Sequence, residues 1–221
     1  MRGPAGVLAG GAGDGDVSVG AVATVGGDPV PVGEVDAAEA RLRRGPAAAA
    51  LPAPGTGEGR QLRRWLTQLI VTGRVVAAEA AARGLTAAGA PTEDELLPDA
   101  TARLEIGSVA AAALADPLAR ALFADVTAAV RVGADEVADY HARNPLRFAA
   151  PHPGPHGWRT PALAAPPLAQ VRGAIADHLR GAARRRAFRV WLDARRAALV
   201  RLAPDYEHPG DPRQPDNTHR H

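Results

Sequence analysis

The residues best suited to direct chemistry lie in the last segment of the chain. Imidazole and carboxylate groups recur there, at His208, Asp211, Asp216, His219 and His221. This ligand set suits a divalent metal such as Zn, Ni, Fe or Mn, and the prolines of residues 203–221 would stiffen a loop that closes on one. A complete site needs at least three converging ligands, which the body of the chain could supplement with His141, His152 or His156. The alternative interpretation is a disordered, solubilising tail that binds no cofactor.

Arginine residues form the second group of side chains that could bind a ligand. All 26 basic residues are Arg, yet the formal net charge is only +2. The run Arg184–Arg186, extended by Arg180, Arg189, Arg195 and Arg196, could contact phosphates or an acidic partner. Because the net charge is slight and no recognition motif accompanies the run, a solvated helix face is the simpler interpretation. We therefore expect no nucleic-acid partner.

Several common kinds of catalytic site find no support in the sequence. The chain contains no Cys, which excludes thiolate chemistry, zinc–thiolate sites and disulfides. A nucleophile elbow, a P-loop, a Rossmann glycine fingerprint and the H-E-x-x-H motif are likewise missing from it. The sequence thus favours a binding protein over an enzyme.

Hydrophobic periodicity predicts a mainly α-helical fold with a small β-hairpin near the N-terminus. Val19, Ala21, Ala23 and Val25 alternate before Gly26-Gly27, as in a hairpin strand and its turn. The helices that we expect from three- and four-residue apolar spacing cover 34–44, 60–83, 92–106, 108–130, 135–144 and 168–202. Within them, Gly84 is the predicted C-cap of the second helix, Thr92 and Glu95 have capping-box spacing, and Pro117 should kink or break the fourth.

Composition also predicts the character of the N-terminal segment and whether the chain crosses a membrane. Residues 1–18 are Gly-rich and aperiodic, as in a disordered leader, and they lack the apolar core of a signal peptide. No apolar run approaches the roughly 18 residues of a membrane span. The expectation is a cytoplasmic protein without a membrane partner.

Three segments, in order, resemble the SurA-type family of peptidyl-prolyl isomerases and chaperones. They are Val22–Asp36 (a strand, a Gly turn and an E-V-D helix start), Arg60–Leu85 (a helix ending in EAAARG) and Asp135–Phe148 (DEVADYHARNPLRF). In this family the third segment leads into the parvulin isomerase domain. Here only the linker 149–167 separates it from the final helix, so the parvulin domain is missing and isomerase activity is not implied.

The resemblance implies a SurA N-terminal-like helical domain over 19–148, completed by the helix 168–202 packing back on it. Such a module binds unfolded or extended polypeptide, or a partner enzyme, between its helices. The large side chains available for that groove are Trp65, Leu69, Tyr140, Phe188 and Trp191, which also suit a hydrophobic core. The alternative function is a small metal-dependent enzyme or biosynthetic accessory protein that uses the His/Asp tail.

Overall fold

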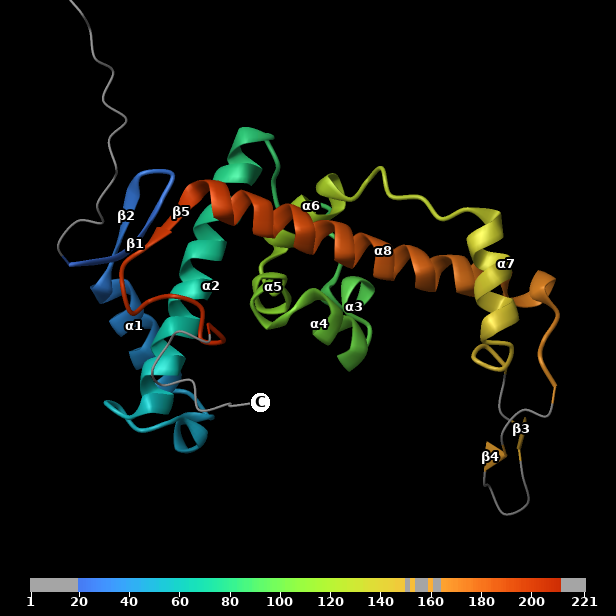
Figure 1. The fold of residues 1–221 in the computed structure, drawn as a ribbon, viewed down its shortest axis with the longest axis horizontal. Coiled ribbons are helices and arrows are strands. Elements are labelled where there is room, and N and C mark those ends of the chain that lie inside the picture. Colours follow the sequence, from blue (N-terminus) through green and yellow to red (C-terminus); the bar gives the residue numbers. More distant parts are fainter. Residues whose placement is uncertain (1–19, 150–151, 154–158, 161–163, 212–221) are drawn as a thin grey trace, which may run out of the picture. The chain divides into compact units, whose positions relative to one another are not determined.

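The chain is mainly helical, as the periodicity predicts (Figure 1). The computed structural model describes residues 20–149, 152–153, 159–160 and 164–211, and these ranges hold eight α-helices and a small antiparallel sheet. These described residues form two compact units, one from residues 20–71 and 199–211 and the other from the described part of 72–198. The first unit is therefore assembled from two separate stretches of chain. The predicted leader, 1–18, lies outside the described residues.

The sheet of the first unit joins an N-terminal hairpin to a late strand. Strands β1 (Ala21–Val25) and β2 (Asp28–Pro31) pair antiparallel, and β5 (Val200–Leu202) pairs with the other edge of β1. Gly26 and Gly27 have φ of 61° and 95°, a left-handed backbone that glycine adopts without strain in a tight hairpin turn. The hairpin prediction is confirmed. The predicted helical end at residue 202 is wrong, because residues 200–202 are extended and hydrogen-bond to β1.

Helix α1 (Val32–Arg43), the short 3₁₀ turn Ala48–Ala50 and the first part of α2 (Gly57–Ala82) complete this unit. The most deeply buried valines of the unit, each at most 1% exposed, are Val22, Val30, Val35 and Val71. The segment after β5 is tied to α2 by two buried side chains. Arg64 donates from Nε to the carbonyl of Asp205 at 3.0 Å, and Gln68 donates from Nε2 to that of Tyr206 at 3.1 Å.

In the second unit, prolines divide two of the predicted helices. The helix predicted over 92–106 is α3 (Glu93–Leu96) and α4 (Ala100–Ile106), separated around Pro98, which lacks the N–H that a continuous helix needs. The helix predicted over 108–130 breaks into α5 (Ser108–Ala113) and α6 (Pro117–Val126), with Pro117 at the start of α6. The capping box of α3 is confirmed, since Glu95 N donates to Thr92 Oγ1 and Thr92 N donates to Glu95 Oε2.

The core of the second unit is centred on α8 (Leu168–Leu199), whose residues through Ala198 belong to this unit. Phe188 of α8 is fully buried, and its ring centroid lies 5.0 Å from that of Phe123 in α6. The other large and fully buried side chains of this unit are Leu97, Ile106, Leu114, Leu122 and Ile175. Helices α3 to α6 thus share one hydrophobic core with α8, the last helix of this unit.

A smaller cluster holds α7 (Ala134–Arg143) near the amino-terminal end of α8 (Figure 1). Val137 of α7 is buried with Val171 and Ile175 of α8. Two short strands, β3 (His152–Pro153) and β4 (Arg159–Thr160), pair antiparallel in the segment predicted as a linker. Over the described ranges, none of the helices combines the length and the apolar character that crossing a membrane requires.

Candidate functional site

The first unit carries an open groove between α1 and α2. Its volume is about 370 Å³, within the range of small binding pockets. The lining residues are Ala38, Arg41 and Leu42 from α1, and Leu66, Leu69 and Ile70 from α2. Leu66 is buried, whereas Leu42, Leu69 and Ile70 remain half-exposed. The walls therefore present apolar surface that a ligand would remove from water.

The groove exists because three- and four-residue spacing places its side chains on one face of each helix. On α2, Leu66, Leu69 and Ile70 are three and four residues apart and project to the same side. On α1, Ala38 and Leu42 are related by the same step.

An ion-pair cluster beside the groove fixes the two helices to each other. Arg63 of α2 donates to Asp36 at 2.7 Å and to Glu39 at 2.8 Å, both on α1. Arg43 donates to Glu39 as well, at 2.6 Å and 2.8 Å. Burial alone would raise the pKa of Glu39, but the hydrogen bonds from Arg63 and Arg43 outweigh burial and lower it. Glu39 is consequently ionised at neutral pH and holds the groove wall in place.

Arg41 is the polar group that distinguishes this groove. Its guanidinium is exposed at the rim, and among the described residues it has no hydrogen bond or ion pair. This contrasts with Arg43, two residues later, which is fully engaged by Glu39 and by the carbonyl of Pro52. A guanidinium in this position has five N–H donors ready for a ligand's carbonyl or carboxylate oxygens.

The five predicted groove residues fall at three different places. Leu69 lines the α1–α2 groove, and Trp65, four residues earlier on α2, is half-buried. Phe188 and Trp191 stack at 5.7 Å in the core region of the second unit, where Arg83 lies 5.5 Å above the Trp191 ring. Phe188 is 0% exposed, so it is a core residue in this conformation.

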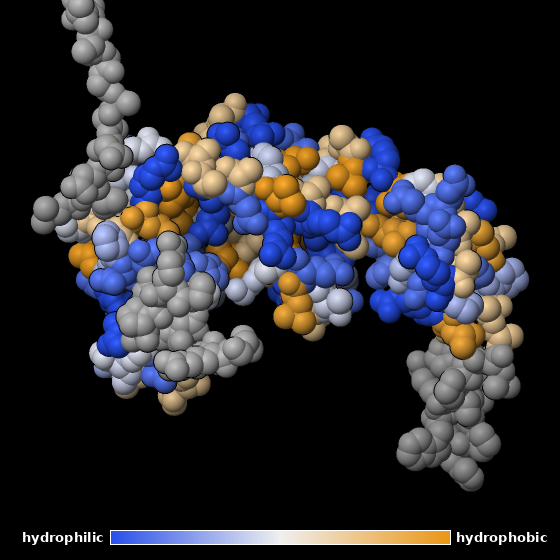
Figure 2. Space-filling view, in the orientation of Figure 1, coloured by the Kyte–Doolittle hydropathy of each residue, from blue (hydrophilic) through white to orange (hydrophobic). Residues whose placement is uncertain are grey.

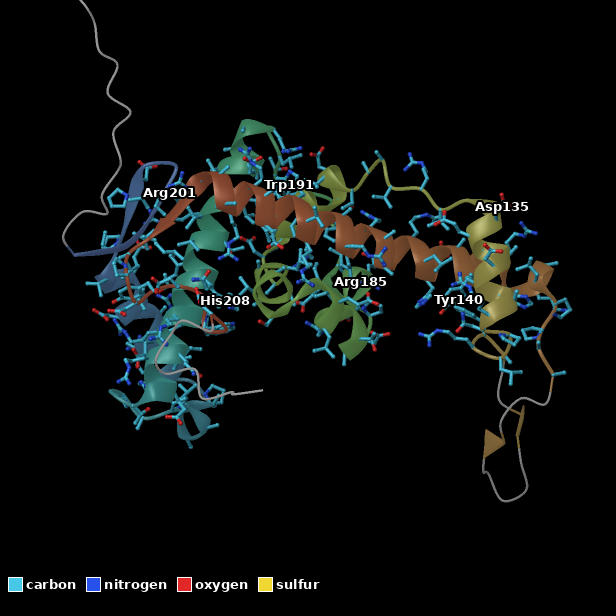
Figure 3. All side chains as sticks on the ribbon, viewed as in Figure 1. Asp135, Tyr140, Arg185, Trp191, Arg201 and His208 are labelled. Atoms are coloured by element: carbon cyan, nitrogen blue, oxygen red, sulfur yellow. The ribbon has the colours of Figure 1, made fainter. Side chains whose placement is uncertain are left out.

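Tyr140 belongs to the α7 cluster, which lies well along α8 from Trp191 (Figure 3). Its hydroxyl is 3.2 Å from Nε2 of His178, and both rings pack against Phe148. Burial lowers the pKa of His178, and the nearby positive charge of Arg147 lowers it further. His178 is therefore neutral at physiological pH. Nothing in the sequence singles out His178, since a lone histidine on a helix belongs to no recognised motif.

The predicted metal site rests largely on residues that the structure does not describe. Asp216, His219, His221 and His156 lie outside the described ranges. His208 and Asp211 are described, and the Nδ1 atom of His208 accepts a hydrogen bond from the backbone N–H of Gly210 at 3.0 Å. Within the described part of the chain, no group of three or more His, Asp or Glu side chains is arranged to hold a metal ion.

Comparison with known proteins adds one partial match. Residues 21–58 are similar to a group described as Family of unknown function (DUF7158). The match includes the hairpin, α1 and the very start of α2, and so one wall of the groove with Arg41. No curated protein matches the chain, and no solved structure does.

Proposed function

We propose that this chain is a chaperone-like module that binds extended polypeptide in the α1–α2 groove and has no isomerase activity. The observation that carries the proposal is the combination of an apolar trough with an unengaged arginine at its rim. An apolar side chain of the client would sit against Leu66, Leu69 and Ile70. Arg41 would donate hydrogen bonds to the client's backbone carbonyl or to a carboxylate.

A SurA-like ancestry is part of this proposal. It is supported by the order of elements, in which a hairpin, α1, a long α2 and later α7 occur at the three segments that carry the resemblance. The pairing of β5 with β1 also supports it, because a late segment of the chain returns to the first elements. The proposal assigns no catalysis, since residues 149–167 are too few to form a parvulin domain.

The energetics favour weak, reversible capture of clients. Burying one leucine-sized side chain contributes about 1.5–3 kcal/mol, and a hydrogen bond to a charged group contributes roughly another 1.5–3 kcal/mol. Immobilising the client consumes part of this gain. A groove that holds one or two side chains therefore suits transient binding of many sequences, as a chaperone requires.

Two paired substitutions test the proposal. A reduced and alkylated, permanently unfolded client is titrated with the protein, and its aggregation is followed by light scattering. Leu69→Asp should abolish suppression, whereas Leu146→Asp, at a leucine that is 52% exposed and lies outside this groove, should not. Arg41→Ala should weaken client affinity about tenfold, the equivalent of about 1.4 kcal/mol, whereas Arg44→Ala, at the exposed C-cap of α1, should leave it unchanged.

The same assays define failure. If the unmodified protein suppresses no aggregation at any molar ratio, the chaperone proposal is wrong. If it suppresses aggregation but Leu69→Asp and Leu146→Asp behave alike, binding occurs elsewhere than in the α1–α2 groove. Circular dichroism of each variant verifies that its helices are intact.

A further inference from the structure

The arginine run of α8 is divided between the inside and the outside of the second unit. Arg184 donates from Nε to Thr127 Oγ1 at 2.8 Å and lies over the Phe123 ring. Arg185 is 6% exposed and pairs with Glu105 at 2.8 Å (Figure 3). The interpretation of the whole run as a solvated face is therefore wrong for these two residues. Their charges serve packing between α8 and the shorter helices.

The outward arginines border a second groove, between α4 and α8. It has a volume of about 410 Å³ and is lined by Glu105, Ala182, Arg186, Arg189, Val190 and Asp193. The large apolar side chain among these lining residues, Val190, is 65% exposed. Figure 2 shows hydrophobic patches set among strongly hydrophilic ones on the face in view. A ligand that covers the Val190 side chain would remove its apolar surface from water.

Two arginines at this groove lack a close ion-pair partner among the described residues. Glu105 is already paired with Arg185. Arg189 has only long contacts, 3.9 Å to Asp193 and 3.5 Å to the carbonyl of Glu105. Arg186 is exposed, and within the described ranges its guanidinium has no hydrogen bond or ion pair. A carboxylate-bearing partner would complete the pairing of both arginines.

We propose that the α4–α8 groove binds an acidic, amphipathic segment of a partner protein. Its apolar side chain covers Val190, and its carboxylates pair with Arg186 and Arg189. These two arginines are three residues apart on one helix face, so two carboxylates one helical turn apart on the partner reach both. Nucleic acid fits less well, because a phosphate has no apolar group that could cover the exposed Val190 side chain.

This site is independent of the α1–α2 groove and involves different residues. The probe is a fluorescein-labelled peptide with leucines at helical spacing between glutamates, and binding is measured by fluorescence anisotropy. Arg186→Glu should raise the dissociation constant at least tenfold, and Val190→Ser should raise it severalfold. Arg172→Glu is the matched control, since Arg172 is an exposed arginine of α8 outside the groove, and it should have little effect.

Further measurements distinguish an acidic peptide from other ligands. The affinity should fall with rising salt, and replacing the peptide's glutamates by lysines should abolish binding. The proposal is overturned if the acidic peptide does not bind, if Arg172→Glu weakens binding as much as Arg186→Glu, or if a single-stranded oligonucleotide binds more tightly and displaces the peptide. Leu69→Asp should leave peptide binding intact, which separates this result from the fate of the chaperone proposal.

Discussion

Replacing Phe188 tests whether that side chain supports the core or contacts a ligand. The family resemblance offered Phe188 as a groove residue, and its ring also suited a core position. The structure buries Phe188 completely, with its ring beside those of Phe123 and Trp191. Phe188→Ala removes the ring and leaves a cavity, which typically costs about 3–5 kcal/mol. The two ring contacts, at 5.0 Å and 5.7 Å, place the expected loss in the upper part of that range. This is a large share of the roughly 5–15 kcal/mol that stabilises a typical fold.

Urea unfolding followed by far-UV circular dichroism measures the loss. With a slope of about 2–3 kcal/mol per molar urea, the midpoint of Phe188→Ala should fall by roughly 1.3–2.5 M. Phe188→Leu should cost less, because it retains most of the apolar volume. Val190→Ala, at an exposed site on the same helix, should shift stability by no more than about 0.5 kcal/mol. A loss below about 1 kcal/mol for Phe188→Ala, or a Phe188→Leu variant that is stable but fails to bind clients, would refute the core assignment.

Two further predictions concern charged groups of the second unit. Glu79→Gln removes the buried carboxylate that pairs with Arg195 and Arg83, and it should lower the free energy of unfolding in urea by about 1–2 kcal/mol. This loss is smaller than for a fully buried ion pair, because both arginines are more than a third exposed. The control Glu58→Gln, at an exposed position of the same helix, should cost almost nothing. Because burial and nearby positive charge lower the pKa of His178, the folded state prefers the neutral ring. Stability should thus be constant above about pH 7 and fall as the pH drops below about 6.5, where the unfolded chain takes up the proton first. His178→Gln should reduce this fall, and an identical pH profile in the two proteins would contradict the assignment.

Local patterns in the sequence predicted the local elements well. The alternation up to Val25 and the two glycines after it are sufficient for the hairpin, because a tight turn needs residues that tolerate positive φ. Gly84 was placed as a C-cap by the same reasoning, and it has φ of 64°. The mainly helical class also followed from apolar spacing. Only Pro98, which separates α3 from α4, was overlooked as a helix breaker.

The features that sequence analysis does not predict depend on contacts between residues far apart in the chain. Val200–Leu202 continues the apolar spacing of the preceding helix, and only its pairing with β1 makes it a strand. Arg185 looks like any surface arginine until Glu105, 80 residues earlier, is brought beside it. Of the residues that line the α1–α2 groove, sequence analysis predicts only Leu69. Arg41 cannot be chosen from the sequence, because its lack of an ion pair depends on Arg43 and Arg63 binding the nearby carboxylate of Glu39.

The bond between β1 and β5 has a consequence for biosynthesis. The hairpin leaves the ribosome early, but the strand that covers its open edge is translated only after all of residues 72–198. During that interval β1 has an unpaired edge, to which another nascent chain can add. The second unit is completed at almost the same time, because its core needs α8, whose residues through Ala198 are translated just before β5. Nascent chains that stall before residue 200 should for this reason be more prone to aggregate than chains that have passed it.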